Sequence, residues 1–185
     1  MIENARVKNA VSDVNGVTAA VNAYRDRYRA TAGDDGPLAT LQARGGSWAN
    51  ITAAGDGNGA LVAAAASTFT GAAGEHVAFW QALKASGYIS GDPADAAAAA
   101  LPRNPFGGLT GIVNAAVMGN ITIPAVCMSQ VPGKAAVALD NQLDDGNPAA
   151  GTVRATTGAA GANTAPGAAA AAYVETGIYT VCRTI

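Results

Sequence analysis

The sequence predicts an α+β fold, because helical periodicity marks its amino-terminal end and strand-like segments gather toward its carboxyl-terminal end. Half of the 185 residues are apolar, but alanine supplies much of that fraction and only 5% are aromatic. A chain of this length suits one hydrophobic core. We therefore expect a single domain over residues 1–185, in which small side chains pack around few large ones.

A long helix is predicted at the amino-terminal end, within residues 1–32. Its apolar residues recur at spacings of three and four, which places them along one stripe. The stripe comprises Val7, Val11, Val14, Val17, Val21, Tyr24 and Tyr28. Glu3 in the first turn and Arg25, Arg27 and Arg29 in the last complement the helix dipole. Gly16 either bends this helix or is tolerated within it.

Residues 33–108 are predicted to form a variable region of mixed α and β structure, with a helix near residues 75–86. Trp80 on that helix is expected to lie against the core, and Gly87 supplies a C-terminal cap. The glycine-rich segment AGDGNG at residues 54–59 predicts a turn.

Residues 109–185 contain the segments expected to form a sheet. Strand-like patterns occur at residues 109–117, 120–128, 152–156 and 173–183. Between them, VPGKAAVALDNQLDDGNPAAGTVRA at residues 131–155 predicts a short helix, an acidic turn and a strand. The small-residue segment at residues 157–171 predicts an exposed, flexible loop.

Two cysteines stand in strand-like surroundings near the carboxyl-terminal end. Cys127 follows the apolar run ITIPAV, and Cys182 ends the run IYTVC. We predict a structural disulfide between them, and two buried free thiols are the alternative.

Composition and motifs argue against several kinds of function. A charged fraction of 13% and a net charge of −2 provide no extended positive surface for nucleic acid. The only histidine, His76, shares a helical face with Trp80, so packing explains it better than catalysis. The glycine groups lack the lysine and spacing of nucleotide-binding loops, and no serine lies in a nucleophile elbow. We therefore predict that the chain is not an enzyme and takes no organic cofactor.

The acidic turn is the one constellation with chemical potential. Asp140 and Asp144 are expected on one helical face, where like charges repel, and Asp145 follows at the negative end of the helix. This arrangement is costly unless positive charge compensates it, and Lys134, Arg154 and a bound calcium ion are the candidates. A solvated structural turn is the first interpretation, and a calcium ion bound by Asp140, Asp144, Asp145 and Asn147 is the alternative.

Several segments, taken in order, carry a family resemblance. The opening MIENARVKNAVSDVNGVTAAVNAYRDRYRATAGDD is followed by EHVAFWQALKASGYISGD, NPFGG, the segment at residues 131–155 and finally YTVC. The first resembles the exposed half of the long amino-terminal helix of type IV pilins and type II secretion pseudopilins. The others resemble later segments of pilin-like proteins, so the resemblance covers most of the chain, with gaps.

The resemblance implies a long helix packed on an antiparallel sheet, with a disulfide from Cys127 to Cys182 bounding the carboxyl-terminal region. It also implies a structural subunit of a type IV pilus or pilus-like filament, which serves adhesion, motility, DNA uptake or secretion. The residues of the assembly helix would be Val7, Val11, Val14, Val17 and Val21. The prepilin leader and the apolar half-helix that anchors such a subunit in the inner membrane are expected to precede Met1.

The partners implied are other pilins in a homo- or hetero-oligomeric filament, with no direct binding of nucleic acid. The implied location is an extracellular filament or the periplasm, with a membrane anchor before assembly. The competing class is a secreted, non-enzymatic binding module that uses AGDGNG or the acidic turn for calcium-dependent recognition. Upstream sequence discriminates the two, because a removable signal peptide favours the binding module.

Overall fold

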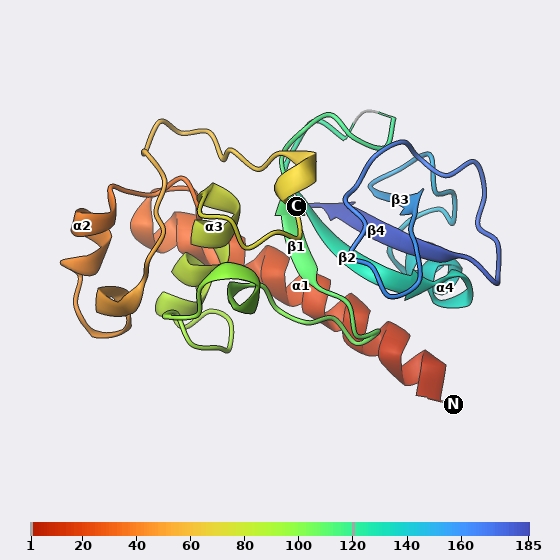
Figure 1. Ribbon diagram of the computed structural model, residues 1–185, viewed down its shortest axis with the longest axis horizontal. Helices are drawn as coiled ribbons and strands as arrows, with labels where there is room; N and C mark the ends of the chain where they lie inside the picture. Colours follow the sequence, from red (N-terminus) through yellow and green to blue (C-terminus); the bar gives the residue numbers. More distant parts are fainter. Residues whose placement is uncertain (1, 120) are drawn as a thin grey trace. The chain divides into compact units, whose positions relative to one another are not determined.

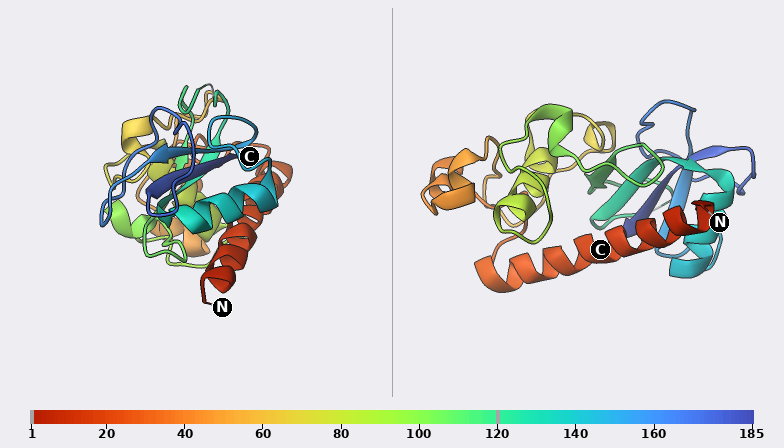
Figure 2. Two further views of the ribbon diagram at one scale, coloured as in Figure 1. Left: turned by 90° about the vertical axis from the view of Figure 1, so that its right-hand side faces the viewer. Right: turned by 90° about the horizontal axis from the view of Figure 1, so that it is seen from below.

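The computed structural model describes residues 2–119 and 121–185 (Figure 1). Contacts divide the chain into two compact units. The sheet unit comprises Met1–Asn15, Ala64–Phe69 and Arg103–Ile185, and the helical unit comprises Gly16–Ala63 and Thr70–Pro102. Helix α1, Ile2–Tyr28, is one continuous helix that contributes residues to both units (Figure 2).

The predicted helices are present. Three further α-helices follow α1, namely α2 (Leu38–Gln42), α3 (Glu75–Ala85) and α4 (Gly133–Leu143), with short 3-10 helices at Gly46–Asn50, Ala65–Ser67 and Ala97–Ala100. The strands are β1 (Thr110–Val113), β2 (Ala125–Pro132), β3 (Val153–Thr157) and β4 (Ile178–Thr184). Within the described residues, none of the helices combines the length and the apolar character that crossing a membrane requires.

The strands form one antiparallel sheet in the order β1-β2-β4-β3. Cys127 on β2 lies directly opposite Cys182 on β4, and the two are joined by a disulfide. A β-bulge shifts the register of β2 between Met128 and Val131. The α+β class and the disulfide predicted from the sequence are therefore confirmed.

The first two predicted strands have wrong bounds. β1 ends at Val113 and β2 begins at Ala125, whereas strand patterns were expected over residues 109–117 and 120–128. Val117 and Ile121 instead pair with each other through two backbone hydrogen bonds, which closes a local turn. Apolar residues near this turn therefore satisfy their backbone groups outside the sheet. Asn120 lies outside the described residues.

The last predicted strand also begins too early, because β4 starts at Ile178 rather than Tyr173. The backbone N–H of Gly177 donates to the carbonyl of Val174 at 2.8 Å, and the N–H of Val174 donates to the Tyr179 hydroxyl at 2.7 Å. These bonds fold the residues before β4 into a turn.

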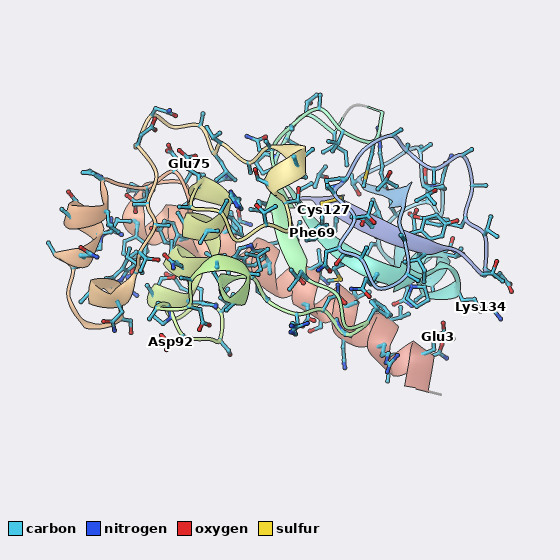
Figure 3. All side chains as sticks on the ribbon, in the orientation of Figure 1. Glu3, Phe69, Glu75, Asp92, Cys127 and Lys134 are labelled. Carbon is cyan, nitrogen blue, oxygen red and sulfur yellow. A yellow bond between two sulfur atoms is a disulfide. The ribbon has the colours of Figure 1, made fainter. Side chains whose placement is uncertain are left out.

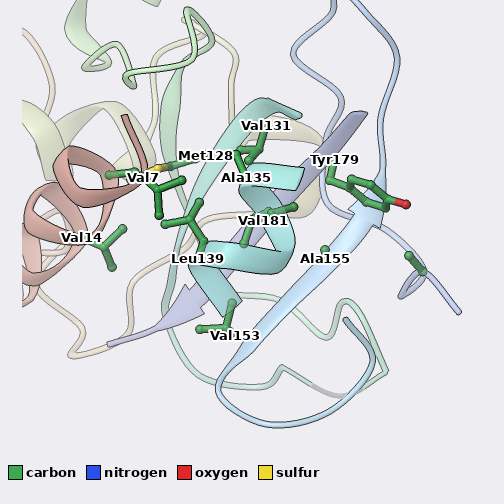
Figure 4. Packing of buried hydrophobic residues seen from close by; sticks show 13 residues of the cluster. Val7, Val14, Met128, Val131, Ala135, Leu139, Val153, Ala155, Tyr179 and Val181 are labelled. Atoms are coloured by element: carbon green, nitrogen blue, oxygen red, sulfur yellow. The ribbon is translucent and has the colours of Figure 1, made fainter. Parts of the chain in front are cut away.

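One face of the sheet is covered by α1 and α4. Figure 4 shows Val7 of α1 beside Leu139 of α4 and Met128 of β2. The buried cluster comprises Val7, Ala10, Val14, Met128, Val131, Ala135, Ala136, Leu139, Val153, Ala155, Ala170, Tyr179 and Val181. Small alanines on both helices allow them to approach the sheet closely, as the alanine-rich composition predicts.

The segment at residues 157–171 is tied to β3 and β4, so the prediction that it is exposed is wrong in part. The Thr156 and Thr180 hydroxyls donate to its carbonyl groups, at Ala168 (2.5 Å) and Thr164 (2.6 Å). The N–H of Ala170 donates to the Ala155 carbonyl on β3, and Ala170 is buried. The segment thereby covers part of the open edge of the sheet.

In the helical unit, α3 is buried along almost its whole length. Trp80 is fully buried, which confirms the prediction that it lies against the core. Its ring meets the ring of Phe79 edge-on. The helix ends at Ala85, and Gly87 two residues later has a φ of 78°, which suits glycine, while the N–H of Tyr88 donates to the Leu83 carbonyl. His76 is buried too, and its burial lowers its pKa.

Candidate functional site

The acidic turn after α4 brings three of its predicted residues together. One carboxylate oxygen each from Asp140, Asp144 and Asp145 lies within 4.8 Å of the other two. The prediction that Asp140 and Asp144 share a helical face is wrong in its geometry, because α4 ends at Leu143 and Asp144, with φ −155° and ψ −131°, is not helical. The turn, rather than the helix face, therefore gathers the carboxylates.

Asp140 is fully buried and both of its carboxylate oxygens accept hydrogen bonds. The Gly146 N–H donates to Oδ1 at 3.0 Å, and the Tyr173 hydroxyl donates to Oδ2 at 2.7 Å. Burial raises the pKa of Asp140, although these two hydrogen bonds oppose that rise. Burial and Asp140 in turn raise the pKa of Tyr173, so this hydroxyl remains a donor.

Asp144 anchors the start of β3. Its Oδ2 accepts from the N–H of Thr152, from the Thr152 hydroxyl at 3.2 Å and from the N–H of Val153 at 3.0 Å. The backbone hydrogen bond from Val153 is the main cause that lowers the pKa of Asp144, and the charge of Arg154 contributes. The chain thus supplies its own compensation for this carboxylate.

Asp145 and Asn147 complete the turn with local hydrogen bonds. Asp145 Oδ1 accepts from the N–H of Asn147 at 2.8 Å, and Asn147 Oδ1 accepts from the N–H of Ala149 at 3.0 Å. These bonds give the turn a structural role that needs no metal ion. The carboxylate oxygens remain suitable ligands for calcium, and calcium binding by Asp140, Asp144, Asp145 and Asn147 stays a prediction.

Replacing Asp144 with asparagine should lower the free energy of unfolding by about 1 kcal/mol at pH 7, because hydrogen bonds to a charged acceptor weaken. The lowered pKa stabilises the folded state above the ordinary value of 3.8, and this contribution is lost as the pH falls through the folded-state pKa. The difference between wild type and Asp144→Asn should therefore shrink in acid. Urea unfolding at pH 7 and pH 3 measures it, and the exposed Asp145→Asn is the control. Equal losses in the two variants would contradict the anchoring role.

The residues predicted for the assembly helix lie inside the chain's own core. Val7, Val14, Val17 and Val21 are buried, and Val11 is partly buried. Most of their apolar area is therefore already covered within the single chain.

Sequence reasoning missed a second group of carboxylates, which lies in the helical unit. Asp34, Asp56 and Glu75 each offer one carboxylate oxygen within 4.8 Å of the other two. These residues come from separate segments, so no local spacing signals them. The glycine-rich AGDGNG, which contains Asp56, was predicted as a turn and, in the binding-module alternative, as a segment for calcium-dependent recognition, but Asp34 and Glu75 were not connected with it.

Comparison of the chain with models of protein families, with curated proteins and with solved structures found no significant match. The function is therefore inferred from the geometry of α1, of the sheet and of the acidic groups, and from the resemblance of several segments to pilin-like proteins.

Proposed function

We propose that this chain is the globular part of a structural subunit of a type IV pilus or pilus-like filament. The observation that carries the proposal is the two-sided character of α1. Its apolar stripe is buried in the sheet unit and in the helical unit, while polar residues on its other faces are exposed between Glu3 and Arg27. Such a helix can hold its own domain on one side and meet neighbouring subunits on the other.

The exposed surface of α1 is polar. It includes Glu3, Asn4, Arg6, Lys8, Asn9, Ser12, Asp13, Asn15, Asn22, Arg25, Asp26 and Arg27. Both signs of charge occur there, so neighbouring subunits can meet through ion pairs and hydrogen bonds, which are individually weak. Most of the apolar driving force for assembly must then come from the apolar half-helix expected before Met1. Val7, Val11, Val14, Val17 and Val21 serve assembly indirectly, by fixing the helix to its domain.

The sheet and its loops supply the surface function in this proposal. Apart from α2, two 3-10 helices and the last residue of β3, the segments at residues 38–74 and 157–171 form loops rich in alanine and glycine, and loops tolerate the variation that recognition surfaces need. The partners are other pilins, and the disulfide suits the periplasm or the cell exterior. No catalytic role is assigned to the chain.

The sequence encoded upstream of Met1 tests the proposal. We expect a short basic leader, a processing glycine and about 20 apolar residues continuous with α1, which is the length of a membrane-spanning helix. A cleavable signal peptide, or a native start at Met1, would overturn the filament proposal and favour a secreted binding module.

A further inference from the structure

The second acidic cluster is built from three parts of the helical unit. Asp34 follows α1, Asp56 lies in the AGDGNG turn, and Glu75 begins α3, where Figure 3 labels it. Three backbone N–H groups of the turn donate hydrogen bonds to Asp34 and its neighbour Asp35. The N–H of Gly59 donates to Asp34 Oδ2 at 2.9 Å. The N–H groups of Gly57 and Gly55 donate to the backbone carbonyls of Asp34 and Asp35, respectively. The fold therefore forces these acidic side chains together.

Asp34 carries the observation that points to a ligand. Its residue surface is only 3% exposed, and its Oδ1 is buried with no hydrogen-bond partner among the described residues. Leaving a charged oxygen buried and unpartnered is costly. Its neighbour Asp35 shows the contrast, because Asp35 Oδ2 accepts from the Tyr24 hydroxyl at 2.6 Å and pairs with Arg44 at 2.9 Å.

The charge of the cluster is also uncompensated by close ion pairs. The ion pairs of the described residues include none of the three carboxylates. One carboxylate oxygen of each residue lies within 4.8 Å of an oxygen of the other two, so their negative charges repel one another. A bound cation would relieve both the repulsion and the burial of Asp34 Oδ1.

We propose that Asp34, Asp56 and Glu75 bind one calcium ion. All three offer hard oxygen ligands, and the flexible geometry of calcium suits ligands from three different segments better than the strict octahedron of magnesium does. An open cavity of about 570 Å³ borders Asp34 and is lined also by Arg25, Arg29, Gly57 and Gly59. Arg25 and Arg29 also place positive charge beside Asp34, so they compete with a calcium ion in neutralising the carboxylates.

The bound ion ties the AGDGNG turn to the end of α1 and the start of α3. Because glycines at 55, 57 and 59 leave this turn with little side-chain packing of its own, the ion supplies order that the apolar core does not. This inference does not depend on filament assembly, since the site lies within one chain. If the chain binds no calcium, the filament proposal is unaffected. If the upstream sequence overturns the filament proposal, the calcium site is unaffected.

Titration calorimetry of the folded, chelator-treated chain with calcium chloride alone tests the site. We expect one calcium per chain, a higher melting temperature with calcium, and weaker binding of magnesium. Asp56→Asn and Glu75→Gln should each lower calcium affinity at least tenfold, because each removes a charged ligand. Asp34→Asn should do the same. Asp92→Asn is the matched control and should leave the affinity unchanged, because Asp92 is an exposed aspartate of the helical unit that belongs to neither acidic cluster and, like Asp56, accepts a backbone hydrogen bond in its own turn.

Two outcomes overturn the proposal. The first is that the folded wild-type chain shows no heat of binding and no change in melting temperature at millimolar calcium. Neighbouring positive charge from Arg25 and Arg29, or protonation, would then neutralise the carboxylates. The second is loss of binding in Asp145→Asn but not in Asp56→Asn, which places the ion in the turn after α4. Asp56 is exposed, and its side chain bonds with Asn58 in its own turn. Asp56→Asn therefore tests the site even if Asp34→Asn fails to fold.

Discussion

Replacing both Cys127 and Cys182 with alanine should lower the free energy of unfolding by about 4 kcal/mol. The disulfide closes a segment in which the two cysteines are 55 residues apart, and this restricts the unfolded chain. The same bond links β2 to β4, the two central strands of the sheet, so its loss also weakens the folded state. Urea unfolding of the oxidised wild type and of the double variant measures the difference.

Reduction of the wild type provides the control for this experiment. A reducing agent should shift the urea midpoint of the wild type toward that of the double variant, and it should leave the double variant unchanged. Amide exchange should accelerate first within residues 127–182, because the disulfide restrains that part of the sheet unit. Midpoints that agree between the oxidised wild type and the double variant would show that strand pairing alone determines stability.

Local patterns predicted the helices well, because helix periodicity and capping involve near neighbours in sequence. The valine stripe of α1 and the Gly87 cap of α3 both depend on residues within a few positions of one another. The disulfide was predictable because the chain contains only two cysteines. The strand bounds were not, because the bridge from Val117 to Ile121 competes with the sheet and has the same apolar pattern.

The two acidic clusters show the same difference between local and distant information. Asp140, Asp144 and Asp145 are close in sequence, and the structure brings them together. Their hydrogen-bond donors, such as the Tyr173 hydroxyl, come from distant segments that no spacing reveals. The cluster of Asp34, Asp56 and Glu75 was missed because its members meet only through the tertiary fold. The sequence pattern therefore identified Asp140, Asp144 and Asp145, whose carboxylates already accept hydrogen bonds. It did not identify Asp34, whose buried Oδ1 has no hydrogen-bond partner among the described residues.

The NPFGG segment, which contributed to the family resemblance, has a structural explanation in Asn104. Asn104 is 5% exposed and its side chain makes four hydrogen bonds. Its Oδ1 accepts from the N–H groups of Phe106 (2.9 Å) and Gly108 (3.2 Å). Its Nδ2 donates to the carbonyls of Leu109 (3.1 Å) and Ser129 (2.8 Å), which joins the turn to β2.

Glycine at 108 completes this arrangement. A Cβ atom there would lie 2.4 Å from the Ser129 carbonyl oxygen, so a side chain would push the turn away from β2. Asn104 can reach the Ser129 carbonyl because the turn lies this close. The segment therefore closes one end of the sheet with a buried amide side chain, beside Phe106, which packs against the core.

Asn104→Ala should lower the free energy of unfolding by roughly 3 kcal/mol, because it leaves several buried backbone groups without partners. Asn147→Ala is the matched control, since Asn147 also accepts a backbone hydrogen bond in a turn of the sheet unit but is exposed. Its loss should stay within about 0.5 kcal/mol. Urea unfolding of both variants at pH 7 compares them. Similar losses of unfolding free energy in the two variants would mean that water or a rearranged turn replaces the hydrogen bonds of the Asn104 amide. The buried hydrogen bonds would then not explain why asparagine stands in the NPFGG segment.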